Sequence, residues 1–194
     1  MGILYICGTP IGNLEDVSIR LLKTLRRVDL IACEDTRHTI KLLNRYKIKK
    51  KLVSYHQYSG PKQENYIVAE LLSGKTVALV TDAGMPGISD PGLGVIQKAI
   101  ASGIKIEVVP GPSAVIAALS MSGMETEGFF FRGFLPARSR QRLTALSELA
   151  HIKNTLVFYE APHRLLNTLE DMLGIWGDRD LVVARELTKI HEEI

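Results

Sequence analysis

The stretch TDAGMPGISDPG, residues 81–92, follows the apolar run TVALV at residues 76–80 and places three glycines and two prolines within nine residues. An ordinary turn needs only one or two such residues. Prolines hold a backbone in place, and glycines leave it uncovered by side chains. We therefore expect a buried strand that ends in a loop of fixed and open shape.

Short apolar runs alternate with amphipathic segments on both sides of this loop. A short apolar run is typical of a buried strand, and apolar residues spaced three and four apart are typical of a helix. The alternation predicts an α/β fold with a mostly parallel sheet that helices cover on both faces. The expected strands in the first half are residues 3–7, 30–33, 52–55, 76–81 and 106–109.

Local signals predict where several helices begin and end. Asp16 can cap one helix, and Ser59 precedes another that Gly74 ends. Asp90 and Pro91 supply a cap and a first-turn proline for the helix after the glycine-rich loop.

The chain is expected to form two domains. The segment PGPS at residues 110–113 interrupts the pattern, and three further strands are expected at residues 129–131, 155–159 and 181–184. We predict an N-terminal α/β domain at residues 1–112, a linker helix at 113–123 and a C-terminal α/β domain at 124–194. A sheet of three strands is small, so we expect the protein to continue beyond Ile194.

The amino-acid composition limits the classes of protein to which the chain can belong. Hydrophobic residues make up 46% and charged residues 23% of the 194-residue chain, as in ordinary soluble proteins. The net charge of +3 permits an anionic partner without requiring one. Cys7 and Cys33 form neither a metal motif nor a disulfide framework, so we expect buried thiols in a reducing cytoplasm. No signal peptide and no stretch long enough to span a bilayer is evident, so we expect no membrane association.

Three familiar binding motifs are present only in part, and each lacks a residue that it requires. Gly74-Lys75-Thr76 resembles the end of a P-loop, but Ala69 stands where its first glycine belongs. Residues 8–12 follow the first strand without the spacing of a dinucleotide fingerprint, and Pro10 removes an amide that could meet a phosphate. His191 has no second histidine at zinc-binding spacing, so we expect no metal site.

Unusual segments follow the expected strands at their carboxyl ends, where ligands bind in open α/β sheets. Loops are polar and rich in Gly and Pro in any protein, so one such segment carries little weight. Their gathering at one edge favours a binding site. The segments are residues 8–13, 34–37, 82–92, 110–114, 160–164 and 185–189.

The motifs together resemble the family of bacterial ribosomal RNA small-subunit methyltransferase I, a branch of the tetrapyrrole-methylase superfamily. The resemblance covers essentially the whole chain in order, although the family's C-terminal part is missing. PGPSA occurs across the superfamily, whereas EDTR, DAGMPGISDPG and YEAPHR together are more specific to the ribosomal RNA branch. The motifs are GTPIGN, ACEDTR, TDAGMPGISDPG, PGPSA, GFLP, YEAPHR and RELTK.

The resemblance implies a fold, a reaction and partners. It implies two α/β domains with S-adenosylmethionine, the methyl donor, in the cleft between them. It implies 2′-O-methylation of a cytidine ribose in 16S ribosomal RNA. The implied partners are 16S RNA or the small ribosomal subunit and a second copy in a homodimer, and the implied location is the cytoplasm.

The resemblance also implies which residues hold the donor. The superfamily's Gly-Asp-Pro donor loop corresponds to residues 82–88, with Gly84 near the place of its aspartate, so that main-chain groups replace a side-chain contact. The implied donor-binding residues are Pro10, Gly84, Gly87, Ile88, Ser113, Ala114, Glu160, Ala161, Leu187 and Thr188.

The charged residues at the expected edge are candidates for the chemistry. We predict that Asp35, Arg37 and Arg164 act on the substrate side, and the residues single out no general base. As alternatives, Glu34 and Asp35 can cap the next helix, and Arg37 can pair with one of them.

Arginines cluster in the segment RGFLPARSRQR, and their planar guanidinium groups suit phosphates. Phe134 within this segment can stack on a base or belong to the core. A lysine run at residues 47–51 is more simply a solvated face. We predict RNA contacts from Arg132, Arg138, Arg140 and Arg142.

Two other functions remain open. A tetrapyrrole C-methyltransferase of the same fold is disfavoured by the DAGMPGISDPG loop and the arginine cluster. A non-catalytic RNA-binding module is disfavoured because a disused loop need not keep so many glycines and prolines.

Overall fold

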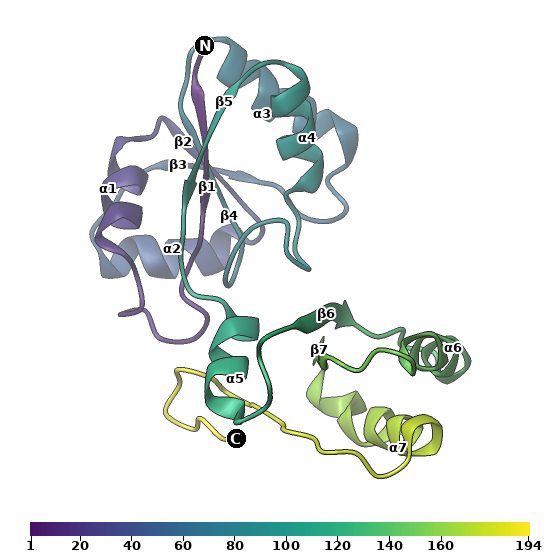
Figure 1. Ribbon diagram of the computed structural model, residues 1–194. Coiled ribbons are helices and arrows are strands. Elements are labelled where there is room, and N and C mark those ends of the chain that lie inside the picture. Colours follow the sequence, from purple (N-terminus) through teal and green to yellow (C-terminus); the bar gives the residue numbers. More distant parts are fainter. The chain divides into compact units, whose positions relative to one another are not determined.

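Five strands from the first half of the chain pair into one sheet in the computed structural model, which describes residues 1–194. All pairs are parallel, and the order across the sheet is β3-β2-β4-β1-β5 (Figure 1). Each predicted strand is present within one residue at either end. The strands are β1 Ile3–Cys7, β2 Leu30–Cys33, β3 Lys51–Ser54, β4 Val77–Val80 and β5 Lys105–Val109.

The chain divides into two units. Unit 1 comprises Met1–Ala114 together with Glu186–His191, and unit 2 comprises Val115–Arg185 together with Glu192–Ile194. The five-stranded sheet lies in unit 1. A short segment near the C-terminus therefore completes a unit that is otherwise built from the first half of the chain.

Both faces of the sheet are buried, as the apolar runs predict. In β4, Val77 and Leu79 contribute to the core on one face, and Ala78 and Val80 contribute to the core on the other. Side chains alternate along a strand, so a strand buried on both faces must be apolar throughout. Helices α3 and α4 cover the first face, and α1 and α2 cover the second (Figure 1). These helices are α1 Ile19–Arg27, α2 Thr36–Arg45, α3 Gly60–Leu72 and α4 Leu93–Ala101.

Two predicted helix caps are wrong. Helix α1 is capped by Ser18, whose hydroxyl accepts from the Leu21 amide at 3.0 Å, rather than by Asp16. Helix α4 starts after Gly92, so Asp90 lies outside it. Gly92 has a φ of 154°, and a Cβ there would lie 2.9 Å from the Gly87 nitrogen. The fold of the loop upon itself, and not a carboxylate cap, thus sets the start of α4.

Unit 2 contains a smaller parallel sheet with its own core. Leu146 of α6 and Met172 of α7 belong to that core, and Phe158 of β7 and Trp176 pack against it. None of the helices in the chain is both long and apolar enough to cross a bilayer. The elements are α5 Ala114–Ser122, β6 Phe129–Phe134, α6 Ser139–Leu149, β7 Thr155–Tyr159, the 3-10 turn η1 Pro162–Arg164 and α7 Leu165–Trp176.

The strand predicted at residues 181–184 is absent. Its apolar side chains Leu181, Val182 and Val183 are 53%, 38% and 36% exposed. The nearest pairing is a single antiparallel bridge between Arg185 and Glu193. An apolar run becomes a strand only when another strand pairs with its backbone, and neither β6 nor β7 does so.

The two cysteines are buried, as predicted from their places in apolar runs. Burial raises the pKa of the Cys7 thiol to about 12, with the Arg20 charge acting in the opposite direction. Cys7 therefore stays protonated and unreactive near neutral pH.

The backbones that follow β1 and β5 approach closely. A Cβ added at Gly111 would lie 2.6 Å from the Gly8 carbonyl oxygen and 2.8 Å from the Gly8 Cα. Real Cβ contacts are never this short, and the obstructing atoms are backbone atoms that cannot turn aside. The contact therefore requires glycine at both positions.

We predict that Gly111→Ala destabilises unit 1 by about 1–3 kcal/mol, because the methyl group must push the two loops apart. Thermal and urea unfolding would measure the effect. Gly174→Ala is the matched control, since no atom lies within 4 Å of that Cβ position. Equal stability of Gly111→Ala and the wild-type protein would contradict the close approach.

Candidate functional site

The loops after β1 and β4 interlock at the carboxyl edge of the large sheet. Thr9 and Gly84 exchange two backbone hydrogen bonds, at 2.9 and 3.1 Å, and the Thr9 hydroxyl donates to the Thr81 carbonyl at 3.0 Å. Gly84 has a φ of 74°, and the nearest atom to a Cβ there is the Pro112 carbonyl oxygen at 3.6 Å. The glycine-rich loop is thus fixed against the loop after β1, and both backbone polar groups of Gly84 are used in this contact.

A segment near the C-terminus packs on the loop after β1. The Asn13 amide donates to the Thr188 hydroxyl at 3.0 Å, and a Cβ at Gly12 would lie 2.6 Å from the Leu187 carbonyl oxygen. Glu186 and Thr188 have φ values of 53° and 66°, in the left-handed region that costs about 1–3 kcal/mol per non-glycine residue. Strain of this kind concentrates at binding sites. The predicted residues Leu187 and Thr188 therefore do meet the edge of unit 1.

A hollow of about 450 Å³ opens between the loops after β1 and β4 and helix α2. Its volume falls within the usual range of about 300–1,000 Å³ for small-molecule sites. Of the predicted donor-binding residues of unit 1, Pro10 lines this hollow, whereas Gly84, Gly87, Ile88, Ser113 and Ala114 do not, and contact with the donor stays a prediction. The lining residues are Thr9, Pro10, Ile11, Gly12, Leu14, Leu25, His38, Thr39, Lys41, Leu42, Val80, Thr81, Asp82, Ala83 and Lys189.

Carboxylates gather where the neighbouring strands β2 and β4 end. The Asp35 amide donates to Asp82 Oδ1 at 3.2 Å, and the Asp82 backbone hydrogen-bonds to the Glu34 carboxylate. Asp82 lines the first hollow and also a second hollow beside these carboxylates, so the two hollows share this residue. The second hollow measures about 410 Å³ and is lined by Glu34, Asp35, Thr36, Arg37, Ser54, His56 and Asp82.

Burial and neighbouring carboxylates raise the pKa values of Glu34 and Asp90. Burial and the charge of Asp82 raise the pKa of Glu34 above its usual value. Burial, followed by the charges of Glu34 and Asp82, raises the pKa of Asp90 to about 6. From the sequence, Asp90 was expected to cap a helix, and nothing local indicates this environment. The one available signal is its position at the end of the 82–92 loop, which was itself predicted to belong to the site.

Asp35 and Arg37 lie together at the rim of the second hollow. Asp35 caps α2 by accepting from the Arg37 amide at 2.8 Å, so the alternative capping role is confirmed. Its other carboxylate oxygen lies 2.8 Å from Arg37 Nη2, and the Arg37 side chain is 89% exposed. Hydrogen bonds from the Arg37 side chain and backbone lower the pKa of Asp35 to about 2. The predicted substrate-side role of the two residues stays a prediction.

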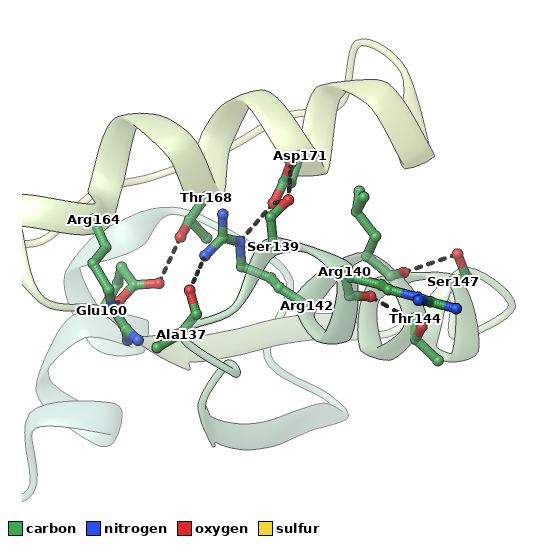
Figure 2. A network of polar contacts seen from close by, with 11 residues as sticks. Ala137, Ser139, Arg140, Arg142, Thr144, Ser147, Glu160, Arg164, Thr168 and Asp171 are labelled. Atoms are coloured by element: carbon green, nitrogen blue, oxygen red, sulfur yellow. Dashed lines mark hydrogen bonds and ion pairs between the residues drawn. The ribbon is translucent and has the colours of Figure 1, made fainter.

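In unit 2, Glu160 is fully occupied by partners. Its carboxylate accepts from the Ala161 amide at 2.7 Å, from the Thr168 hydroxyl at 2.6 Å and from Arg164, at 2.8 Å to Nε (Figure 2). Burial disfavours its charge, but these hydrogen bonds prevail and hold the pKa of Glu160 below its usual value. Arg164 is mostly buried and committed to this contact, so an RNA contact by Arg164 would require the pair to open.

The prediction that Arg142 contacts RNA is wrong for a physical reason. Arg142 is 3% exposed; its Nε lies 2.6 Å from Asp171 Oδ2, and its Nη1 donates to the Ala137 carbonyl at 3.3 Å (Figure 2). It joins α6 to α7 inside unit 2 and cannot reach a phosphate. The other predicted arginines, Arg132, Arg138 and Arg140, are exposed.

Residues 3–194 match the sequence model of a protein family described as Tetrapyrrole (Corrin/Porphyrin) Methylases. The chain belongs to the tetrapyrrole methylase family. This confirms the resemblance and the α/β fold predicted from the motifs.

Two relatives within this methylase family carry the name of the predicted branch. The chain is 52% identical over 192 residues to "Ribosomal RNA small subunit methyltransferase I" of Halalkalibacterium halodurans, covering 99% of this chain and 66% of that protein. It is 51% identical over 193 residues to the protein of the same name in Thermotoga maritima, covering 100% of this chain and 86% of that protein. The chain thus spans only about two thirds of the first relative's length.

A solved structure with the same methylase fold is more distant in sequence. The uroporphyrin-III C-methyltransferase of Thermus thermophilus in complex with S-adenosyl homocysteine has a TM-score of 0.65 and 16% identity. The match covers 100% of this chain and 86% of that one. At this identity the likeness shows the fold alone.

We predict that Arg142→Ala destabilises unit 2 by about 3 kcal/mol, because it leaves Asp171 without its buried counter-charge. Arg140→Ala, on the same helix but exposed, should change stability by less than about 0.5 kcal/mol. Thermal unfolding of both variants would measure the difference. If the two unfold alike, the contact between Arg142 and Asp171 does not hold α6 to α7.

Proposed function

We propose that the protein is an S-adenosylmethionine-dependent methyltransferase that methylates a cytidine ribose 2′-oxygen in 16S ribosomal RNA. The proposal rests on sequence identities of 52% and 51%, over nearly the whole chain, to two proteins named for ribosomal RNA methylation. Its partner is then the small ribosomal subunit or its RNA, in the cytoplasm, with the protein acting as a homodimer. The division into domains at residues 1–112, 113–123 and 124–194 stays part of the proposal.

The residues of unit 1 fit the methyl donor. The donor carries a positively charged sulfur bearing an activated methyl group, and the carboxylates at the ends of β2 and β4 favour a positive charge nearby. The exposed loop residue Ala83 and the adjacent hollow that it lines offer space for a ligand. The residues of unit 1 proposed to hold the donor are Pro10, Gly84, Gly87, Ile88, Ser113, Ala114, Leu187 and Thr188.

The reaction also needs an acceptor for the proton that the ribose hydroxyl loses. A base works best when its pKa lies near the working pH, and that of Asp90 is about 6. Asp90 is therefore largely ionised at neutral pH, yet more basic than an ordinary aspartate. We therefore propose Asp90 as the general base on the strength of its neighbours Glu34 and Asp82, although Asp90 itself lines neither hollow. Arg37, exposed and held by Asp35, is then placed to contact a phosphate beside the target nucleotide.

A tetrapyrrole C-methyltransferase remains the second candidate, because the matching family is described by that substrate class. A non-catalytic RNA-binding module is the third. Donor binding separates the third candidate from the first two, and the choice of substrate separates those two.

The first test uses full-length protein, methyl-labelled S-adenosylmethionine, small ribosomal subunits from cells lacking the protein, and a tetrapyrrole precursor in parallel. We expect label in an alkali-resistant dinucleotide, because a methylated ribose cannot cleave its neighbouring phosphate. Label only in the tetrapyrrole would contradict the proposal in favour of the second candidate. Donor binding without label in the RNA would contradict catalysis on ribose.

The second test addresses Asp90. Only the ionised carboxylate accepts a proton, so we predict that kcat/KM falls as the pH drops below about 6. Asp90→Asn should lower the rate at pH 7 by about 100-fold or more and remove this acidic limb. Asp16→Asn, an exposed aspartate outside both hollows, is the control for the loss of one charge. An unaltered pH profile in Asp90→Asn would exclude Asp90 as the base.

A further inference from the structure

The two faces of the small sheet in unit 2 differ. Phe158 of β7 packs on the core beneath α6 and α7, with its ring centroid 6.1 Å from that of Trp176. Successive side chains along a strand point to opposite faces, so Tyr159 points away from the helices. The rings of Phe131 and Phe134 lie 5.0 and 5.4 Å from the Tyr159 ring, which places them on that same face.

An irregularity in β6 creates this arrangement. Phe131 and Phe134 are three residues apart, so a regular strand would place them on opposite faces. The pairing of β6 with β7 shifts between Phe131 and Gly133, which leaves Arg132 as an extra residue, and Gly133 has a φ of 75°. Such β-bulges re-aim side chains and are common next to functional sites. Here the bulge brings both phenyl rings to Tyr159.

The resulting surface is open to solvent. Phe129 lies two residues before Phe131 and so shares its face, and it is 41% exposed. Phe134 is 51% exposed, whereas Phe131 and Tyr159 partly cover each other. We call Phe129, Phe131, Phe134 and Tyr159 the aromatic face.

Positive charge accompanies the aromatic face. Arg132 occupies the bulge itself, and Arg138 and Arg140 follow within six residues of the end of β6. All three side chains are exposed, and none forms an ion pair in the structure, in contrast to Arg142. Guanidinium groups without ion pairs, close in sequence to exposed rings, complement a chain of phosphates that carries unstacked bases.

We propose that the aromatic face binds single-stranded RNA, with bases stacked on Phe134 and its neighbouring rings and phosphates held by Arg132 and Arg138. The inference rests on the proposed RNA substrate and narrows it to an unpaired segment. Stacking accepts any base, so this surface supplies affinity for single strands and leaves the choice of the target cytidine to the residues of unit 1.

The test uses the full chain and a short oligoadenylate that contains one 2-aminopurine, whose fluorescence is quenched by stacking. Phe134→Leu keeps an apolar side chain but removes the ring, and we expect it to weaken single-strand binding on the order of tenfold and to relieve the quenching. Phe130→Leu is the matched control, because Phe130 is 40% exposed on the same strand but on the helix-covered face. Binding of the same oligoadenylate paired with oligouridylate should be unchanged in both variants.

Each other outcome overturns the proposal. Equal affinity and quenching in Phe134→Leu and the wild-type protein, with RNA still bound, would reject the aromatic face and leave the proposed methyltransferase untouched. If Phe134→Leu instead shifts the mass in sedimentation, a second copy of the chain occupies this surface. A wild-type protein that binds and methylates no RNA would reject the proposed function itself.

Discussion

The close approach of three backbone segments at one edge of the large sheet is the constraint on which the site depends. The loop after β1 touches the loop after β4 through Thr9 and Gly84, and the loop after β5 through Gly8 and Gly111. Because the backbones are so close at these contacts, there is no room for a side chain at Gly8 or Gly111, which explains the glycines in these segments. The same constraint sets the start of α4, because the glycine-rich loop must close at Gly92 before a helix can begin.

Charged groups behave differently in the two units. At the edge of unit 1, burial and the charges of nearby carboxylates raise the pKa values of Glu34 and Asp90. In unit 2, Glu160 and Asp171 each have an arginine partner that is largely buried. Unit 1 therefore keeps its carboxylates chemically available, whereas the inner arginines of unit 2 stabilise its small core.

The sequence predicts best what is decided locally. Strands β1, β2 and β7 match to the residue, because an unbroken apolar run is sufficient to identify a buried strand. The strand at residues 181–184 failed because pairing depends on a distant partner. Arg140 and Arg142 are both exposed candidates by residue type, but Arg142 shares the buried face of α6 with Ala145, Leu146 and Leu149 and pairs there with Asp171 of α7. The environment of Asp90 was missed for a similar reason, since its raised pKa follows from burial in the fold and from the charges of Glu34 on another loop and Asp82 on its own loop.

The return of residues 186–191 to unit 1 has a consequence for the order of assembly during synthesis. The sheet of unit 1 is complete in sequence once β5 has emerged, so its core can collapse early. The contact between Asn13 and Thr188 spans 175 residues and can form only after all of unit 2 up to Arg185 has been made. The loop after β1 thus acquires its final shape last, and a nascent chain holds a folded sheet well before it holds a finished site.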